Sequence, residues 1–223
     1  MESNNTKYET VDDLPKSLPV FPLTAALLLP GGNLPLNIFE PRYLAMIDAA
    51  LAGDRMIGMV QPAITGQSST ENGLCQIGCA GRLVSFSETS DGRYVIGLVG
   101  ISRFSIHSEL ETTTPFRQAV TDWSAFENDL KPDLSNSQID RELLLETFRA
   151  YLDQNDMEVD WEGIEEADTG VLVNALSMMS PYGAAEKQAF LEAKDLKQRA
   201  DTLVAITEIF LAKQASDSGV TLQ

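Results

Sequence analysis

Histidine and cysteine are scarce in this sequence, which has one histidine and two cysteines among its 223 residues. A structural zinc site takes four ligands, and Cys75, Cys79 and His107 supply only three of the usual type. The two cysteines lie four residues apart in an expected strand, about 13 Å along it, which is too far for a disulfide. We expect no metal and two buried free cysteines. A reactive thiol is the alternative.

Motifs for nucleotide binding and for catalysis are also missing. No G-x-x-x-x-G-K-[ST] run occurs, no lysine follows Pro30-Gly31-Gly32-Asn33, and no G-x-G-x-x-G opens a helix. His107 would have to be the base of any Ser-His-Asp arrangement, but no G-x-S-x-G turn supplies a nucleophile. The adjacent Glu165 and Glu166 lie in an acidic run with no apolar setting to raise a pKa. We expect no catalytic residue, no cofactor and no nucleotide.

Long apolar runs are absent as well. The longest, Ala25 to Leu29, is far below the roughly 20 residues that a membrane helix needs. Residues 1–16 are polar and acidic, without the apolar stretch of a signal peptide. These features predict a cytoplasmic protein that does not bind membranes.

Basic residues are outnumbered, with 16 Lys and Arg against 33 Asp and Glu, for a net charge of -17. Residues 125–223 hold 20 of the acids and 8 of the bases, and residues 153–168 contain eight acids and no base. Such a field repels phosphate backbones, so we expect no nucleic-acid partner. The acidic run is interpreted as a solvated loop, and steering of a basic partner is the alternative.

Proline and turn residues organise the stretch from Leu18 to Tyr43. Alternating apolar residues with Pro19 and Pro22 predict an edge or irregular strand. Residues 27–29 and 34–38 read as two strands joined by a turn at residues 30–33. Pro41, preceded by Glu40, marks the start of a helix.

The rest of the first half is predicted to be rich in strands. Leu44, Ile47 and Leu51 give helical spacing up to a stop at Gly53, and Asp91-Gly92 suits a hairpin turn. Further strands are expected at 56–60, 76–87, 94–99, 103–110 and 116–123, with a loop at 61–73. Many short strands with turns predict a closed or half-closed barrel.

The second half is predicted to be helical. Ser137 is a candidate cap for a helix over 138–152, and Asp168 or Thr169 for a helix that Pro181 ends. Further helices are expected at 184–192 and 196–213. The prediction is therefore an α+β chain with a flexible acidic tail (1–16), a β-rich subdomain (17–124), a connector (125–136), a helical bundle (137–213) and a frayed tail (214–223).

Several of these segments resemble the LON N-terminal domain, the substrate-binding domain of Lon proteases. The matching residues are 18–23, Pro30-Gly31, 34–36, 38–43, 78–82, 100–104, 186–188, Leu191-Glu192 and Arg199. The resemblance implies a PUA-like, LON-type pseudo-barrel with one helix, followed by a helical bundle. It also implies a standalone LON-domain protein of protein quality control, without ATPase and peptidase parts. Leu28-Leu29 and Ser105 depart from the pattern, and Ser105 puts anion binding at that strand in doubt.

The partner that the resemblance implies is unfolded or flexible polypeptide, recognised through exposed apolar surface and backbone. The candidate binding residues are Pro22, Pro30, Leu34, Phe39, Glu40, Arg42 and Tyr43. In the structural alternative, Phe39 lies in the core, Glu40 starts the helix and Arg42 pairs with an acid of a neighbouring strand. A specific folded partner is a second possible function, and an undescribed hydrolase or thiol enzyme using His107 or Cys79 is a third.

Overall fold

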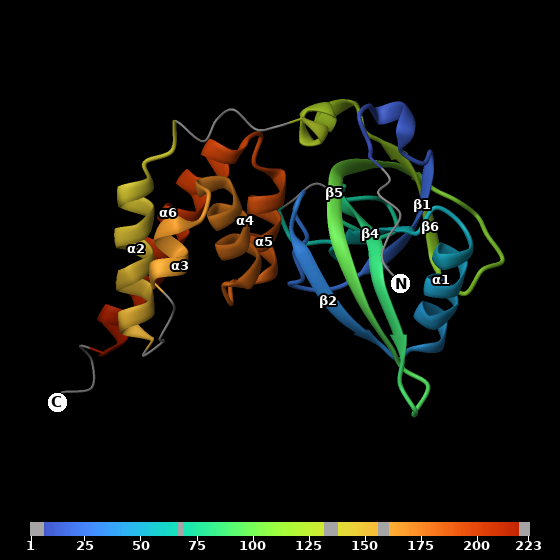
Figure 1. The fold of residues 1–223 in the computed structure, drawn as a ribbon, viewed down its shortest axis with the longest axis horizontal. Coiled ribbons are helices and arrows are strands. Elements are labelled where there is room, and N and C mark those ends of the chain that lie inside the picture. The colour runs from blue at the N-terminus through green and yellow to red at the C-terminus, as the bar shows by residue number, and fades with distance from the viewer. Residues whose placement is uncertain (1–6, 67–68, 132–137, 156–160, 219–223) are drawn as a thin grey trace. The chain divides into compact units, whose positions relative to one another are not determined.

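The computed structural model describes residues 7–66, 69–131, 138–155 and 161–218. The chain divides into two compact units (Figure 1). The strand unit comprises Met1–Pro132 and Pro181–Leu191, and the helical unit comprises Asp133–Ser180 and Glu192–Gln223. The predicted α+β class is confirmed.

The described strands of the strand unit form one mixed sheet in the order β2-β5-β4-β3-β1-β6. A further pairing between β5 and β6 closes five of these strands into a barrel, and β2 extends the sheet beyond β5. Phe104, Leu18, Val20, Ala80 and Ile106 belong to the buried core of the barrel. The strands are β1 (Ser17–Pro22), β2 (Asn33–Ile38), β3 (Met56–Val60), β4 (Ile77–Glu88), β5 (Tyr94–Glu109) and β6 (Arg117–Asp122).

Strand β1 is not an edge strand, so of the two expected alternatives, an edge or an irregular strand, the first is wrong. Ser17 to Val20 pair with β6, and Val20 to Pro22 pair in parallel with β3. The strand changes partner at Val20, and each proline therefore has a neighbouring strand on one side only. The missing N–H of Pro19 or Pro22 is tolerated because each lies on one ladder rather than between two.

Leu27 to Leu29 do not form the expected strand, although all three side chains are buried. Ala25 takes the left-handed conformation (φ 59°), and its N–H donates to Oε1 of Gln61 at 3.0 Å. Further along this loop, the backbone bonds to Gly100 of β5. Gly100 N–H donates to Gly32 O, and Gly31 N–H donates to Gly100 O, both at 2.9 Å. Burial in this loop comes from apolar side chains and not from strand pairing.

Strand β5 joins the two strands expected at 94–99 and 103–110. Its first half pairs with β2 and its second half with β6, while β4 runs along both. A Cβ on Gly100 would collide with the carbonyl oxygen of Leu29, so glycine here allows the loop to approach the strand. Residues 100–102, which were left out of both expected strands, therefore continue the strand.

Residues 7–16 are folded against the barrel, which corrects the expectation of a tail for this part. Leu14 is 5% exposed and belongs to the barrel core. Trp123 Nε1 donates to Pro15 O at 3.1 Å, and Thr121 N–H donates to Lys16 O at 3.0 Å. Residues 1–6 of the expected tail lie outside the described residues.

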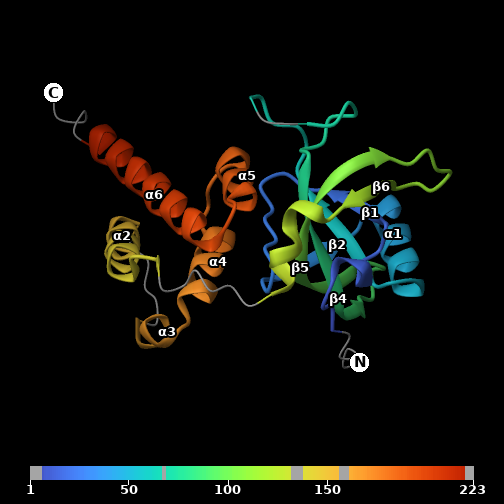
Figure 2. The same ribbon diagram turned by 90° about the horizontal axis from the view of Figure 1, so that it is seen from above.

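Two helices complete the strand unit. Helix α1 (Pro41–Ala52) begins and ends as predicted and buries Tyr43, Met46, Ile47 and Ala50. It lies beside the strands near β1 and β6 (Figure 2). Helix α5 (Ala184–Glu192) also has its predicted bounds, but most of it groups with the strands and not with the 137–213 bundle in which it was expected.

Glutamines hold α5 on the barrel. Gln61 Nε2 donates to Ala184 O at 2.9 Å and to Gln188 Oε1 at 3.1 Å, and Gln188 Nε2 donates to Ile77 O at 3.1 Å. These are hydrogen bonds between groups distant in sequence, which helical periodicity does not reveal.

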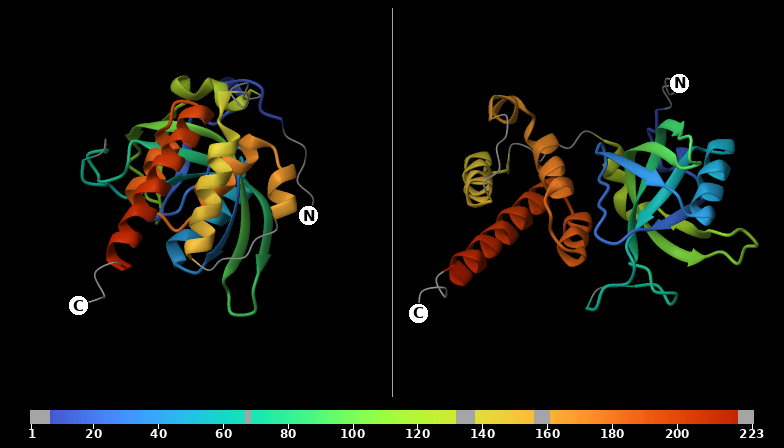
Figure 3. Two further views of the ribbon diagram at one scale, coloured as in Figure 1. Left: turned by 90° about the vertical axis from the view of Figure 1, so that its left-hand side faces the viewer. Right: turned by 90° about the horizontal axis from the view of Figure 1, so that it is seen from below.

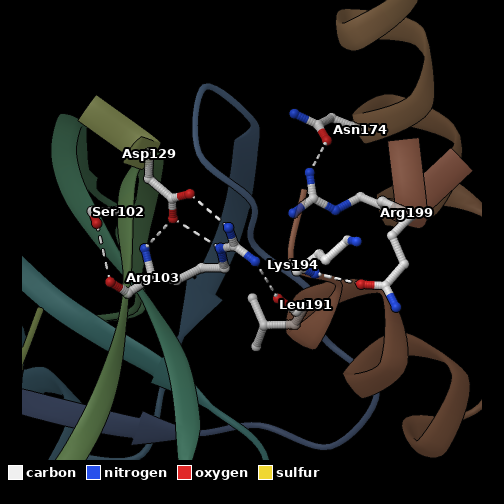
Figure 4. A network of polar contacts seen from close by, with 8 residues as sticks. Ser102, Arg103, Asp129, Asn174, Leu191, Lys194 and Arg199 are labelled. Atoms are coloured by element: carbon white, nitrogen blue, oxygen red, sulfur yellow. Dashed lines mark hydrogen bonds and ion pairs between the residues drawn. The ribbon is translucent and has the colours of Figure 1, made fainter. Parts of the chain in front are cut away.

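The helical unit contains α2 (Arg141–Gln154), α3 (Trp161–Glu166), α4 (Thr169–Met179) and α6 (Leu196–Ser218). Asp140 caps α2 by accepting from Leu143 N–H, so this helix starts later than predicted, and Ser137 lies outside the described residues. Asp168 caps α4, as predicted. Arg141 binds the carbonyl oxygens of Ile164 and Glu165, and Arg199 Nη1 donates to Asn174 Oδ1 at 2.8 Å (Figure 4).

Parts of the predicted connectors are helical as well. The 3-10 segment η2 (Ser124–Leu130) occupies the start of the expected 125–136 connector, whose residues 132–136 lie outside the described residues. Helix α3 lies within the expected acidic loop 153–168, of which residues 156–160 are not described. Helix α6 runs to Ser218, beyond the predicted end at 213, and residues 219–223 of the predicted tail are not described.

Candidate functional site

The corner between β2 and α1 brings four of the predicted binding residues together. Ile38 at the end of β2 is buried, so the next side chain turns to the other face. Phe39 is accordingly 63% exposed. The alternative that places Phe39 in the core is wrong, and the corner presents an aromatic ring to solvent.

The other three residues of the corner form a small stack. Arg42 Nε and Nη2 bond Glu40 Oε2 at 2.9 and 2.8 Å, and the Arg42 guanidinium lies 4.5 Å from the centre of the Tyr43 ring. Tyr43 is buried against Phe21, with ring centres 4.3 Å apart, and burial raises the pKa of Tyr43. Arg42 therefore pairs with the acid at the start of its own helix and not, as expected, with one from a neighbouring strand.

The remaining predicted residues lie elsewhere. Pro22 is half-buried at the end of β1, opposite Val60. Pro30 is half-buried in the loop before β2, and Leu34 is half-buried near the start of β2. Leu34 and Ile38 are four residues apart, so about 13 Å of strand separates Leu34 from the corner. The corner residues thus lie after the end of β2, Pro30 and Leu34 lie near its start, and Pro22 lies on β1.

Strand β2 contributes residues that the sequence interpretation missed. Among the described strands only β5 pairs with it, which leaves its other edge without a strand. Asn33, Pro35 and Asn37 are exposed, and Leu34 and Leu36 are half-buried. The proline at an alternate position of an NLPLNI segment was the available signal, but the edge was assigned to β1.

The hairpin between β4 and β5 adds exposed apolar groups. It projects from the barrel (Figures 1 and 3). Phe86 and Val95 are exposed, and the Phe86 ring packs edge-on against Tyr94, with centres 4.9 Å apart. Tyr94 is the partner of Ile38 in the sheet, and its hydroxyl donates to Asp48 Oδ1 at 3.0 Å, which raises the pKa of Tyr94. Aromatic side chains therefore lie on both strands next to the corner.

The histidine and the cysteines lie away from this surface. Cys75 and Cys79 are free and buried, as predicted. His107 is exposed on β5. No group of three potential metal ligands occurs in the described ranges. None of the helices in the described part of the chain has both the length and the apolar composition needed to cross a bilayer.

Comparison with known proteins gives consistent matches. Residues 17–208 match the model of the ATP-dependent protease La (LON) substrate-binding domain. The Lon protease of Dictyoglomus thermophilum is 23% identical over 189 residues, which are 84% of this chain and 24% of that protein. This chain therefore spans about a quarter of the length of that relative.

Two solved structures have the same fold. The Lon N-terminal domain protein from Xanthomonas campestris aligns with a TM-score of 0.59 and 23% identity, over 85% of this chain and 97% of that one. The N-terminal domain of a Mycobacterium avium complex Lon protease aligns with a TM-score of 0.63 and 19% identity, over 86% and 98%.

Proposed function

This chain belongs to the ATP-dependent protease La (LON) substrate-binding domain family, and on that premise we propose that it binds unfolded or flexible polypeptide without transforming it chemically. The resemblance noted in the sequence is thereby confirmed at the level of the family. Binding of polypeptide is supported by the family description and by one structural observation, the exposure of Phe39 at the corner of β2 and α1.

An exposed phenylalanine in that setting suits transient binding. Its ring is held outward by the burial of Ile38 and Tyr43 on either side, so its position is set before a ligand arrives. Binding to a preformed aromatic surface avoids the entropy of ordering it. The adjacent Glu40–Arg42 pair places polar groups beside the exposed ring.

The test is a titration of the protein into a fluorescent, reduced and carboxymethylated protein that cannot refold. Binding should appear as a saturable rise in anisotropy, and Phe39→Ser should weaken it by about tenfold, the effect of losing about 1.4 kcal/mol of aromatic contact. Ile209→Ser on α6 is the matched control, because Ile209 is also an exposed large apolar residue, and it should leave the affinity unchanged. No rise in anisotropy with the unchanged protein overturns the proposal.

A specific folded partner is the second candidate. Val171 and Met179 are exposed apolar residues on α4 of the helical unit, and they lie eight positions apart, close to one helical face. A folded partner predicts stoichiometric binding that Met179→Ser weakens and Phe39→Ser does not. Equal effects of both substitutions would reject this candidate.

A further inference from the structure

Along β2 the backbone N–H and C=O groups of successive residues point alternately toward β5 and away from it. In the hairpin, Thr89 N–H donates to Arg93 O, so odd-numbered residues of β5 bond β4 there. The Gly100–Gly32 hydrogen bond shows that even-numbered residues of β5 bond toward β2. The partners of these even-numbered residues, Leu34, Leu36 and Ile38, bond back to β5, and the residues between them point the other way. The N–H and C=O groups of Asn33 and Asn37, and the C=O of Pro35, therefore point away from β5.

This outer edge is accessible. Asn33, Pro35 and Asn37 are exposed, and no strand in the described part of the chain pairs with them. Pro35 has no N–H to offer, and it lies at an outward position, where that absence does not disturb the β2–β5 ladder. The edge therefore presents two complete donor–acceptor pairs, at Asn33 and Asn37, on either side of a single acceptor.

Apolar side chains flank the edge at every second position. Leu34, Leu36 and Ile38 share one face with Leu98, Ile96 and Tyr94, their partners in β5. Leu34 and Leu36 are only half-buried because no strand covers their open side. A strand added there would place its own alternate side chains beside these leucines.

The charges around β2 restrict which polypeptide segments can pair with its outer edge. Strand β2 carries no charged residue, and residues 1–132 with 181–191 hold 16 acids against 10 bases. Near the end of β2, Asp48 accepts from Tyr94, and Glu88 lies opposite Tyr94 in the sheet. A neutral or basic segment is complementary to this surface, whereas an acidic one is repelled.

We propose that β2 takes up an extended segment of another polypeptide as an additional strand, apolar at alternate positions and neutral or basic in charge. This inference rests on the proposed function and specifies how the ligand is held: the backbone bonds Asn33 and Asn37, and the side chains contact Leu34 and Leu36. Phe39 lies at the end of this strand and contacts what extends beyond it. Strand addition would let β2 bind segments of many different sequences, because main-chain hydrogen bonds supply the affinity.

The experiment compares Asn37→Pro with Asn37→Ala in the same anisotropy titration. Both substitutions remove the amide side chain, but only proline removes the outward N–H. We expect Asn37→Pro to bind about fivefold more weakly than Asn37→Ala, as the loss of one hydrogen bond predicts. Thermal unfolding midpoints establish that both variants are folded.

A second experiment varies the peptide ligand and uses the unchanged protein. Two versions of a short fluorescent peptide, with alternating apolar and polar residues and a terminal lysine, carry N-methyl groups on one or the other set of alternate amides. Only one set faces β2, so one version should lose binding and the other should keep it.

The outcomes separate the two proposals. Equal binding by Asn37→Pro and Asn37→Ala, or by both methylated peptides, overturns strand addition while the proposed function stands. Absence of binding by the unchanged protein to the unfolded probe overturns both. If Asn37→Pro does not fold, the methylated peptides decide.

Discussion

Nη2 of Arg103 lies 2.7 Å from Oδ1 of Asp129, and the two side chains are only 5% and 9% exposed. Arg103 Nε and its backbone N–H both donate to Oδ2 of Asp129, and Nη1 donates to Leu191 O at 3.1 Å (Figure 4). The guanidinium also lies 4.7 Å from the centre of the Phe126 ring. One arginine of β5 thus holds both η2 and the end of α5.

Removing one partner of this ion pair should be strongly destabilising. Asp129→Ala leaves the Arg103 charge buried without its carboxylate, and we expect the free energy of unfolding to fall by about 3–5 kcal/mol. Urea denaturation followed by circular dichroism measures this change. The exposed pair Arg93–Asp91 is the control, and Asp91→Ala should lower the free energy of unfolding far less, because water already solvates both charges. Similar losses in the two variants would contradict a role for burial.

Gly78 should tolerate no side chain. A Cβ there would lie 2.7 Å from Met59 O and 2.8 Å from Phe104 Cζ, and neither the strand nor the buried ring can move freely. We expect Gly78→Ala to lower the free energy of unfolding by about 1–3 kcal/mol through overpacking. Gly53→Ala is the comparison for packing, since its nearest neighbour would be Ala49 O at 3.5 Å, and it should lower the free energy of unfolding less than Gly78→Ala does. Urea midpoints compare the two, and equal stability would refute the packing account.

Leu14 provides a test of the folded amino-terminal segment. Its side chain is buried in the barrel core, so Leu14→Ala should destabilise the protein by about 2–5 kcal/mol. Leu110→Ala removes the same atoms from an exposed position and should change stability by about 0.5 kcal/mol or less. If both variants melt at the same temperature as the parent, residues 7–16 do not contribute to the fold.

The free energy of unfolding should depend on pH because Lys187 is buried. Burial lowers the pKa of Lys187 from its ordinary 10.5 to about 8. Between these values the unfolded chain binds more protons than the folded one, so stability due to this group rises with pH from about 8 to 10.5. Lys187→Met removes this titration, so the stability of the variant relative to the parent should fall as the pH rises from about 8 to 10.5. The measurement is the urea midpoint of both proteins across this range, and a constant difference would contradict the assignment.

Local signals in the sequence predicted local structure well. The bounds of α1, β3 and α5 follow from Pro41 and Gly53, from a short apolar run, and from helical spacing. Asp168, one of the two candidates for the start of α4, is its cap. In each of these cases the determining interactions lie within a few residues.

Features that depend on distant residues were not predicted. The sequence left Phe39 either exposed or buried, and the burial of Ile38 beside β5 decides for exposure. The free edge belongs to β2, whereas β1 pairs with both β3 and β6. Leu14 joins the core through strands far along the chain. The sequence does not show which strands become neighbours, so the prolines of β1 could be interpreted as marking either an edge or an irregular strand.

The glutamine contacts between the barrel and α5 make the strand unit discontinuous in sequence. The side-chain amide of Gln61 donates to Ala184 and Gln188, which are synthesised long after the last barrel strand ends at Asp122. A nascent chain that has released all its strands from the ribosome still lacks the helix that satisfies this buried amide. Completion of the strand unit is thereby tied to synthesis of the intervening helices. Termination before residue 184 leaves the Gln61 amide without these partners, in a chain on which chaperones or proteases can act.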